Sequence, residues 1–413
     1  MRTGPRNQIA AWCIYDFANT MYSALFITFF FPVFIKNYAG GQEIHVGYVM
    51  SVSTLLAAVL VPVVGALSDQ SGRRMPYLIL CTLGCCAASF AIAFSSLYIA
   101  LALAVVSLFL YGISLAVYDA ILPKLADERT QGTVSGWGVG VGYLGTPFSL
   151  LALAAWMAYA GWDTEFGVRG TFVLTAVLFL GFSLYPFFVI REPKTPSQRS
   201  AFKEISRAFR ELGQTVRRLP QQPGFVAFLG CAFLFWNAIM SVVVFLYLFS
   251  ETKLGLSQQE FVKIYAGLAF AAAIGSWIAG KMTDRFGPKK VLFFCGVVWI
   301  MVLVAFLWIE TLTPFTIAGM IGGAAMASYQ AAVRPFLIQF AAPEQMGEYF
   351  GFLALFNKAS GALGPAVFGW AATTYGYEVA IYILIGFFIA GLICLAFAPD
   401  KRAQPLFRKG TSS

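Results

Sequence analysis

The sequence predicts an all-α integral membrane protein built from two similar halves of six helices each. Three observations support this prediction: an apolar composition, twelve apolar runs of spanning length, and motifs that repeat at one constant offset. Hydrophobic residues make up 59% of the 413 residues and charged residues 11%, whereas soluble domains average roughly 45–50% and about 25%. This composition excludes an ordinary soluble enzyme, a disordered chain and a secreted scaffold.

Twelve apolar runs follow one another along the chain. A helix needs about 20 apolar residues to cross a bilayer, because it rises about 1.5 Å per residue. The runs cover residues 9–36, 46–67, 75–94, 97–121, 134–160, 170–190, 224–250, 258–280, 290–309, 313–340, 347–373 and 378–398. The first run is too long for a signal-peptide core and lacks a small-residue cleavage site, so we expect it to be retained.

Lys and Arg favour one side of this predicted bundle. An even number of spans places both termini on the same side, and 22 of the 28 basic residues fall there, against four on the opposite side. Because cytoplasmic loops carry the excess of Lys and Arg, we expect both termini in the cytoplasm. The net charge of +9 then reports topology and requires no nucleic-acid partner.

The longest connection between runs, residues 191–223, divides the chain. It predicts an N-terminal six-helix half at 1–190, a C-terminal half at 224–400 and a cytoplasmic tail at 401–413. Apolar residues recur within the connection at alternating spacings of three and four, and basic residues occupy the other faces. The apolar positions are Phe202, Ile205, Phe209, Leu212, Val216 and Leu219. We therefore predict a basic amphipathic helix on the inner membrane surface; a site for a regulatory partner is the alternative.

A short polar motif occurs once in each half. The two copies follow the second helix of their halves and lie 215 residues apart. The first copy comprises Gly65, Asp69, Gly72, Arg73 and Arg74, and the second Gly280, Asp284 and Gly287. Two parallel six-helix repeats are the architecture of many secondary transporters, whose substrate site lies between the halves near the middle of the membrane.

These motifs carry a resemblance to a known superfamily. The segment GALSDQSGRRMP (65–76) resembles the loop signature of the major facilitator superfamily, and GKMTDRFGPKK (280–290) resembles its second copy. The resemblance implies that Asp69 meets the start of the eleventh helix near Gly347 when the cytoplasmic side is closed. It implies the same for Asp284 at the start of the fifth helix near Gly132, so that both carboxylates favour the outward-open state.

Other segments are similar to the vacuole-effluxer-like branch of that superfamily. They are WCIYDFANTMYSALF (12–26), VYDAILPKLAD (117–127), SGWGVGVGYLG (135–145) and EYFGFLALFNKASGALGP (348–365). The branch commonly has Asn where Asp119 stands. The resemblance implies amino-acid efflux and, for bacterial members, a multi-pass protein of the inner membrane.

Four ionisable residues lie within the apolar runs: Asp16, Asp119, Arg334 and Lys358. A charge at the bilayer centre costs at least ~2.5–3.5 kcal/mol on insertion scales, so each should face a cavity or a partner. Asp119 and Arg334 are 215 residues apart, at matching heights in the two halves, which predicts a cytoplasmic gate pair; snorkelling to the interface is the alternative. Asp16 lies deeper and is the candidate for proton coupling, and Lys358 could instead pair permanently with a carboxylate.

The remaining polar and aromatic candidates fall on helices that line the cavity in this superfamily. With the ionisable residues they give a predicted substrate site of Asp16, Asn19, Tyr22, Trp236, Asn237, Tyr329, Gln330 and Lys358. An acid, a base, amides and aromatics facing one cavity suit a small zwitterion or another polar metabolite. The bland alternative for the aromatics is packing.

The predicted function is secondary active transport of a small polar solute by alternating access, in the efflux direction and coupled to protons. No Walker loop, zinc motif or nucleophile elbow is present, so the sequence does not support ATP-driven transport or membrane hydrolysis. The sequence has a single histidine, and its seven cysteines all lie within apolar runs. We therefore predict no metal site, no cofactor and no disulfides. We expect a monomer in the bilayer. A lipid or drug exporter of the same fold, and a non-transporting receptor or scaffold, remain as alternatives.

Overall fold

The computed structural model describes residues 5–41, 43–162, 164–192, 217, 221–256, 258–342 and 345–400. The elements found in these residues are all helices. The apolar positions of the predicted amphipathic linker and the tail at 401–413 lie outside the described residues, so those two predictions stay untested.

The helices follow the predicted runs closely. The N-terminal half contains α1 (Pro5–Tyr22), the π-helix η1 (Ser23–Phe30), α2 (Phe31–Asn37), α3 (Glu43–Gln70), α4 (Met75–Ile92), α5 (Leu97–Asp119), α6 (Leu122–Leu125), α7 (Gln131–Ala160) and α8 (Glu165–Val189). The C-terminal half contains α10 (Pro223–Leu254), α11 (Gln258–Phe286), α12 (Pro288–Trp308), α13 (Leu312–Ile338), α14 (Met346–Tyr375) and α15 (Tyr377–Phe397). Glycine or proline marks many of the turns: Gly72 and Gly287 adopt φ of 66° and 90°, a region that glycine enters without strain.

Within the described residues, nine helices are long and apolar enough to cross a membrane. The helices α3, α13 and α14 have the length of a span but are not among the nine, and for them spanning stays a prediction. In α13 the reason is composition, because glycines, Ser328, Gln330 and Arg334 lower its hydropathy. A helix that lines the inside of a bundle does not need an apolar surface on every side.

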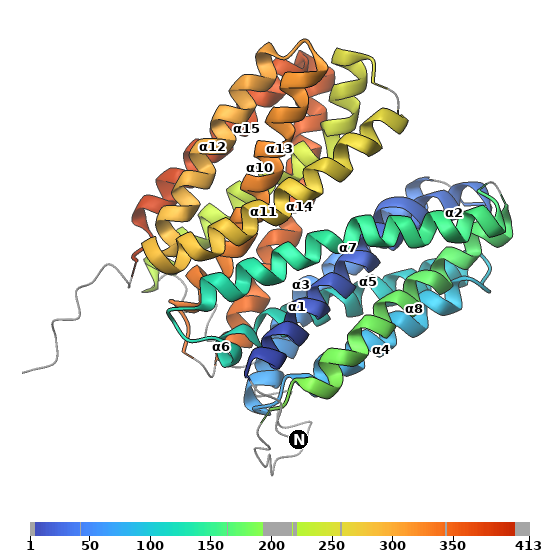
Figure 1. The fold of residues 1–413 in the computed structure, drawn as a ribbon, viewed down its shortest axis with the longest axis horizontal. Coiled ribbons are helices and arrows are strands. Elements are labelled where there is room, and N and C mark those ends of the chain that lie inside the picture. The colour runs from blue at the N-terminus through green and yellow to red at the C-terminus, as the bar shows by residue number, and fades with distance from the viewer. Residues whose placement is uncertain are drawn as a thin grey trace, which may run out of the picture.

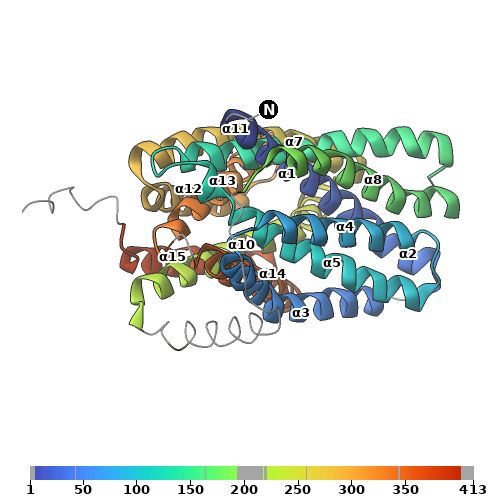
Figure 2. The ribbon, with the colours of Figure 1, turned by 90° about the horizontal axis from the view of Figure 1, so that it is seen from below.

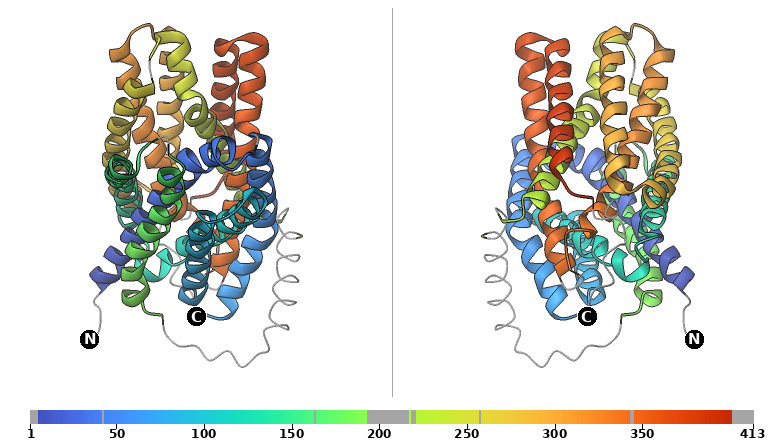
Figure 3. Two further views of the ribbon diagram at one scale, coloured as in Figure 1. Left: turned by 90° about the vertical axis from the view of Figure 1, so that its right-hand side faces the viewer. Right: turned by 90° about the vertical axis from the view of Figure 1, so that its left-hand side faces the viewer.

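The helices form two lobes, coloured blue to green and yellow to red in Figure 1. The lobes meet near α6 and diverge toward their other ends like the arms of a V. Side views show the helices of the C-terminal lobe standing above those of the N-terminal lobe (Figure 3). Each lobe has its own core of fully buried aromatic side chains, such as Phe172 and Phe179 in one and Phe235 and Phe388 in the other.

Two pairs of helices make the most extensive contacts between the lobes: α7 packs on α11, and α3 packs on α14. Figure 2 shows α7 beside α11 and α3 beside α14. Glycines allow the backbones to approach closely, since a Cβ at Gly136 would lie 2.4 Å from the carbonyl oxygen of Ser276, and one at Gly65 would lie 2.2 Å from that of Gly347. We call the end of the bundle where these contacts occur the basic end, because Arg73, Arg74 and Lys289 lie there.

Candidate functional site

A cavity of about 490 Å³ lies between the two lobes. Helices α1, η1, α5 and α7 line it from one lobe, and α10, α11, α13 and α14 from the other. Its polar and aromatic lining residues are Asp16, Asn19, Thr20, Ser23, Tyr111, Asp119, Tyr143, Thr146, Trp236, Tyr265, Tyr329, Gln330, Arg334 and Asn357. The predicted site residues Asp16, Asn19, Trp236, Tyr329 and Gln330 are therefore brought together at one cavity.

Three charged side chains form the floor of this cavity toward the basic end. Arg334 Nε of α13 lies 2.9 Å from Asp119 Oδ1 of α5, and Arg334 Nη1 lies 3.6 Å from Asp16 Oδ2 of α1. The guanidinium also lies 5.6 Å from the ring of Trp12 and 5.7 Å from that of Tyr118, within the range of a cation–π contact. We call Asp16, Asp119 and Arg334 the charged cluster; it joins the two lobes.

The geometry of the charged cluster differs from the sequence prediction in one respect. Asp119 and Arg334 were expected to pair apart from Asp16, which was placed deeper in the membrane. The structure brings Asp16 into the same cluster, because the long side chain of Arg334 reaches from Asp119 to the first helix. The role of the pair as a gate stays a prediction.

Amides and aromatic rings surround the upper part of the cavity. Asn19 Nδ2 donates to Asp16 Oδ1 at 2.9 Å, which fixes the orientation of the carboxylate. Gln330 Nε2 donates to the Tyr143 hydroxyl at 2.7 Å, across the boundary between the lobes. The rings of Trp236 and Tyr329 stack with centroids 5.9 Å apart. These groups offer hydrogen bonds and flat apolar surfaces to a small solute.

Three predicted site residues do not line the cavity. Tyr22 is fully buried in the N-terminal lobe, where its hydroxyl bonds to Ser107 at 2.7 Å. Asn237 points from α10 toward α14, since a Cβ at Gly364 would lie 2.3 Å from Asn237 Oδ1. Asn237 follows the lining residue Trp236 and is rotated from it by about 100° around the helix, which turns it toward α14 and away from the cavity.

Lys358 is the third of these residues. It lies on α14 directly after Asn357, which does line the cavity, but its side chain reaches α5 of the other lobe. A Cβ at Gly112 would lie 3.1 Å from Lys358 Nζ. In the part of the chain that the structure describes, no carboxylate pairs with this ammonium, so the alternative of a permanent ion pair finds no partner there.

The repeated loop motif forms two contacts across the lobes at the basic end, which we call the clamps. Asp284 Oδ1 and Oδ2 accept hydrogen bonds from the backbone N–H groups of Gly132 at 2.7 Å and Thr133 at 2.6 Å, at the start of α7. Asp69 Oδ2 accepts from the N–H of Glu348 at 3.2 Å, at the start of α14. A helix start carries about half a positive charge, so each carboxylate is attracted to it.

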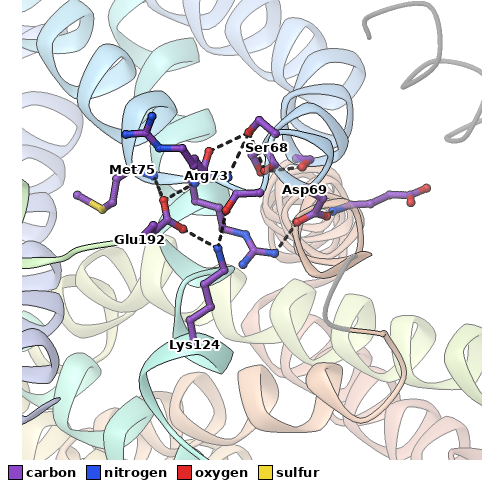
Figure 4. A network of polar contacts seen from close by, with 11 residues as sticks. Ser68, Asp69, Arg73, Met75, Lys124 and Glu192 are labelled. Atoms are coloured by element: carbon purple, nitrogen blue, oxygen red, sulfur yellow. Dashed lines mark hydrogen bonds and ion pairs between the residues drawn. The ribbon is translucent and has the colours of Figure 1, made fainter. Parts of the chain in front are cut away.

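The clamp at Asp69 belongs to a larger polar network that the sequence analysis missed (Figure 4). The Arg74 guanidinium forms an ion pair with Asp69. Glu192, just after α8, accepts from the N–H of Arg74, from the N–H of Met75 at 2.7 Å and from Lys124 Nζ at 2.7 Å. The only signal for Glu192 was an acidic residue among basic ones at the end of the sixth run.

Other lining residues were also missed. Tyr143 on α7 and Tyr265 on α11 lie on helices from which no cavity residue was predicted, and Asn357 on α14 lines the cavity where its neighbour Lys358 was predicted to do so. A signal did exist for Tyr143, because it is the only hydroxyl-bearing residue in the glycine-rich segment SGWGVGVGYLG after Ser135.

The sequence of this chain is similar to those of known transporters. A family model described as vacuole effluxer Atg22-like matches residues 41–405. An uncharacterised MFS-type transporter, YxiO of Bacillus subtilis (strain 168), is 27% identical over 95% of this chain and 94% of its own. The multidrug resistance protein MdtG of Salmonella paratyphi C is 24% identical over 86% of this chain and 87% of its own.

Solved structures show the fold. The human organic anion transporter MFSD10 superposes with a TM-score of 0.78 at 14% identity, over 95% of this chain and 99% of its own. The transporter FucP in its outward conformation superposes with a TM-score of 0.77 at 12% identity, over 95% and 99% of the two chains. Both matches are transporters with the major facilitator fold.

Proposed function

Because the chain belongs to the vacuole effluxer Atg22-like family of major facilitator superfamily transporters, we propose that it moves a small polar solute, such as an amino acid, by alternating access. The relatives are transporters and not enzymes. The basic end faces the cytoplasm in this proposal, as the distribution of Lys and Arg predicts. In this proposal the protein is a monomer in a bacterial inner membrane and moves the solute out of the cytoplasm.

The observation that supports this proposal best is the charged cluster at the floor of the cavity. Its acidic members come from α1 and α5 and its basic member from α13, so the cluster holds the lobes together only while the basic end is closed. A solute with an ammonium and a carboxylate can compete for both kinds of partner. Binding would then weaken the contact between the lobes and allow the cavity to open at the basic end.

Proton coupling is assigned to Asp16 in this proposal. Asp16 lines the cavity and shares Arg334 with Asp119. Protonation of Asp16 would leave the guanidinium to Asp119 alone, and release of the proton would restore the shared arrangement. Binding of a proton and binding of a solute would thereby act on the same contact between the lobes.

The test is counterflow in proteoliposomes that contain the purified full chain. Vesicles loaded with an unlabelled mixture of the twenty L-amino acids are diluted into the same mixture carrying a radiolabel. We expect transient accumulation of label that empty vesicles lack and that Arg334→Gln reduces at least tenfold. Failure to accumulate any label, with the protein folded and reconstituted, would refute amino-acid transport.

The similarity to MdtG favours a drug exporter as the second candidate. The same vesicles separate the two functions when they are tested with a lipophilic cation, tetraphenylphosphonium, in place of the amino acids. Accumulation of the cation without accumulation of amino acids would select the exporter.

A further inference from the structure

We propose that Lys358 binds an anionic group of the solute, such as a carboxylate, and that it does so only when the lobes separate at the basic end. This inference rests on the proposed function and assigns a residue that lies outside the cavity in the present state. It gives a role to a lysine in the middle of α14.

The first step is that the Lys358 ammonium has no ion-pair partner among the described residues. The other charged side chains at the boundary between the lobes have partners: Arg334 lies against two carboxylates, and the carboxylates of both clamps accept backbone N–H groups. Among the described residues the Lys358 ammonium has none. A charge in a membrane interior that stabilises nothing is expected to serve a ligand.

The second step is the place of the side chain. Lys358 belongs to α14 of the C-terminal lobe, yet its Cε and Nζ lie beside Gly112 of α5 in the N-terminal lobe. The glycine leaves room for the ammonium, because a Cβ there would lie only 3.0 Å from Cε. The side chain is thus held against the opposite lobe, and it is released when α5 and α14 move apart.

The third step is charge. The charged cluster contributes two carboxylates and one guanidinium to the cavity. Asn357, the neighbour of Lys358, already faces that cavity. A change of rotamer, together with the movement of α14 away from α5, would bring the released Lys358 ammonium to the same cavity. It would supply the second cation, and the separated lobes would present two acids and two bases to a solute. The new cation has no protein partner, which favours an anionic group on the solute.

A stability measurement tests the first two steps without any ligand. We expect Lys358→Met, which removes a lone charge and keeps a long flexible side chain, to raise the thermal unfolding midpoint of the purified full chain. The variant should nevertheless lose at least nine-tenths of its counterflow. A lower unfolding midpoint for Lys358→Met would mean that the lysine stabilises the fold, and the proposal would be overturned.

A competition experiment tests the anion. Counterflow of the labelled amino-acid mixture is competed by L-alanine or by L-alaninamide, which lacks the carboxylate. A hydrogen bond to a charged group gives a preference of on the order of tenfold or more, so alanine should compete at least tenfold better in the unmodified chain and in Lys358→Arg. The preference should fall below threefold in Lys358→Gln.

The two proposals fail in different ways. An absence of counterflow in the unmodified chain refutes amino-acid transport, while the unfolding midpoint of Lys358→Met still decides whether the lysine is structural. Counterflow with an unchanged preference for alanine in Lys358→Gln refutes the role of Lys358 and leaves the proposed function intact.

Discussion

The clamp at Asp284 gives the sharpest prediction about closure of the basic end. Its carboxylate accepts two backbone N–H groups, at 2.7 and 2.6 Å, from the first residues of α7. Asp284→Asn keeps one acceptor oxygen but removes the charge and the second acceptor. Hydrogen bonds to charged groups contribute about 1.5–3 kcal/mol, and a carboxylate at a helix start about 0.3–2 kcal/mol. We expect a net loss of about 2 kcal/mol in the closed state.

A loss of that size corresponds to a change of about thirtyfold in the equilibrium between closed and open basic ends. The reporter is Ser276→Cys, a nearly isosteric change at a fully buried position where α11 contacts α7. The seven native cysteines are free thiols, and six of them are buried, so they are first replaced by alanine or serine. In this background the rate of labelling by a soluble thiol reagent should rise up to thirtyfold when Asp284→Asn is added.

Asp127→Asn is the matched control. Asp127 carries the same charge at the same end of the bundle, but its carboxylate accepts from the hydroxyl of Thr130 on its own loop. The control should leave labelling of Ser276→Cys unchanged. An equal rate in all three proteins, or an equal increase in the control, would show that Asp284 does not hold the basic end closed.

Three further predictions concern the charged cluster and the loop network. Asp119→Asn should shift the equilibrium away from the closed basic end about five- to thirtyfold, because the ion pair with Arg334 contributes a net ~1–2 kcal/mol after desolvation. The charge swap, Asp119→Arg with Arg334→Asp, should restore part of the counterflow. No recovery in the swapped protein would exclude a direct pair. Asp16→Asn should abolish accumulation driven by a pH gradient while exchange persists, and continued accumulation would place coupling elsewhere. Glu192→Gln should lower the thermal unfolding midpoint by a few degrees, since two backbone N–H groups and Lys124 lose a charged acceptor; a midpoint equal to that of the unmodified chain would contradict this.

The fold and the clamps could be predicted because their signals are local and repeated. Apolar run length defines the helices, and the 215-residue offset between Asp69 and Asp284 identifies equivalent loops. Each carboxylate meets the start of a helix from the other lobe, a contact that depends on helix ends and is insensitive to how a helix is rotated about its axis.

The composition of the cavity could be predicted only in part, because it depends on helix rotation. Tyr22 is six residues after Asp16, which places it about 120° away around the helix, and its hydroxyl finds Ser107 inside the lobe. Lys358 and Asn357 are adjacent, yet only the asparagine faces the cavity. Which neighbour faces inward follows from packing between lobes, and a single sequence does not contain that packing.

The two clamps are unequal, and the inequality gives the opening motion a direction. The Asp284 carboxylate holds two N–H groups at short distance, whereas the Asp69 carboxylate holds the N–H of Glu348 at 3.2 Å and divides its charge with Arg74. We therefore expect the α3–α14 seam to open more readily than the α7–α11 seam. We expect the lobes to begin to separate between α3 and α14, before α7 and α11 part. A solute arriving from the basic end would then reach the cavity on the side where Lys358 lies.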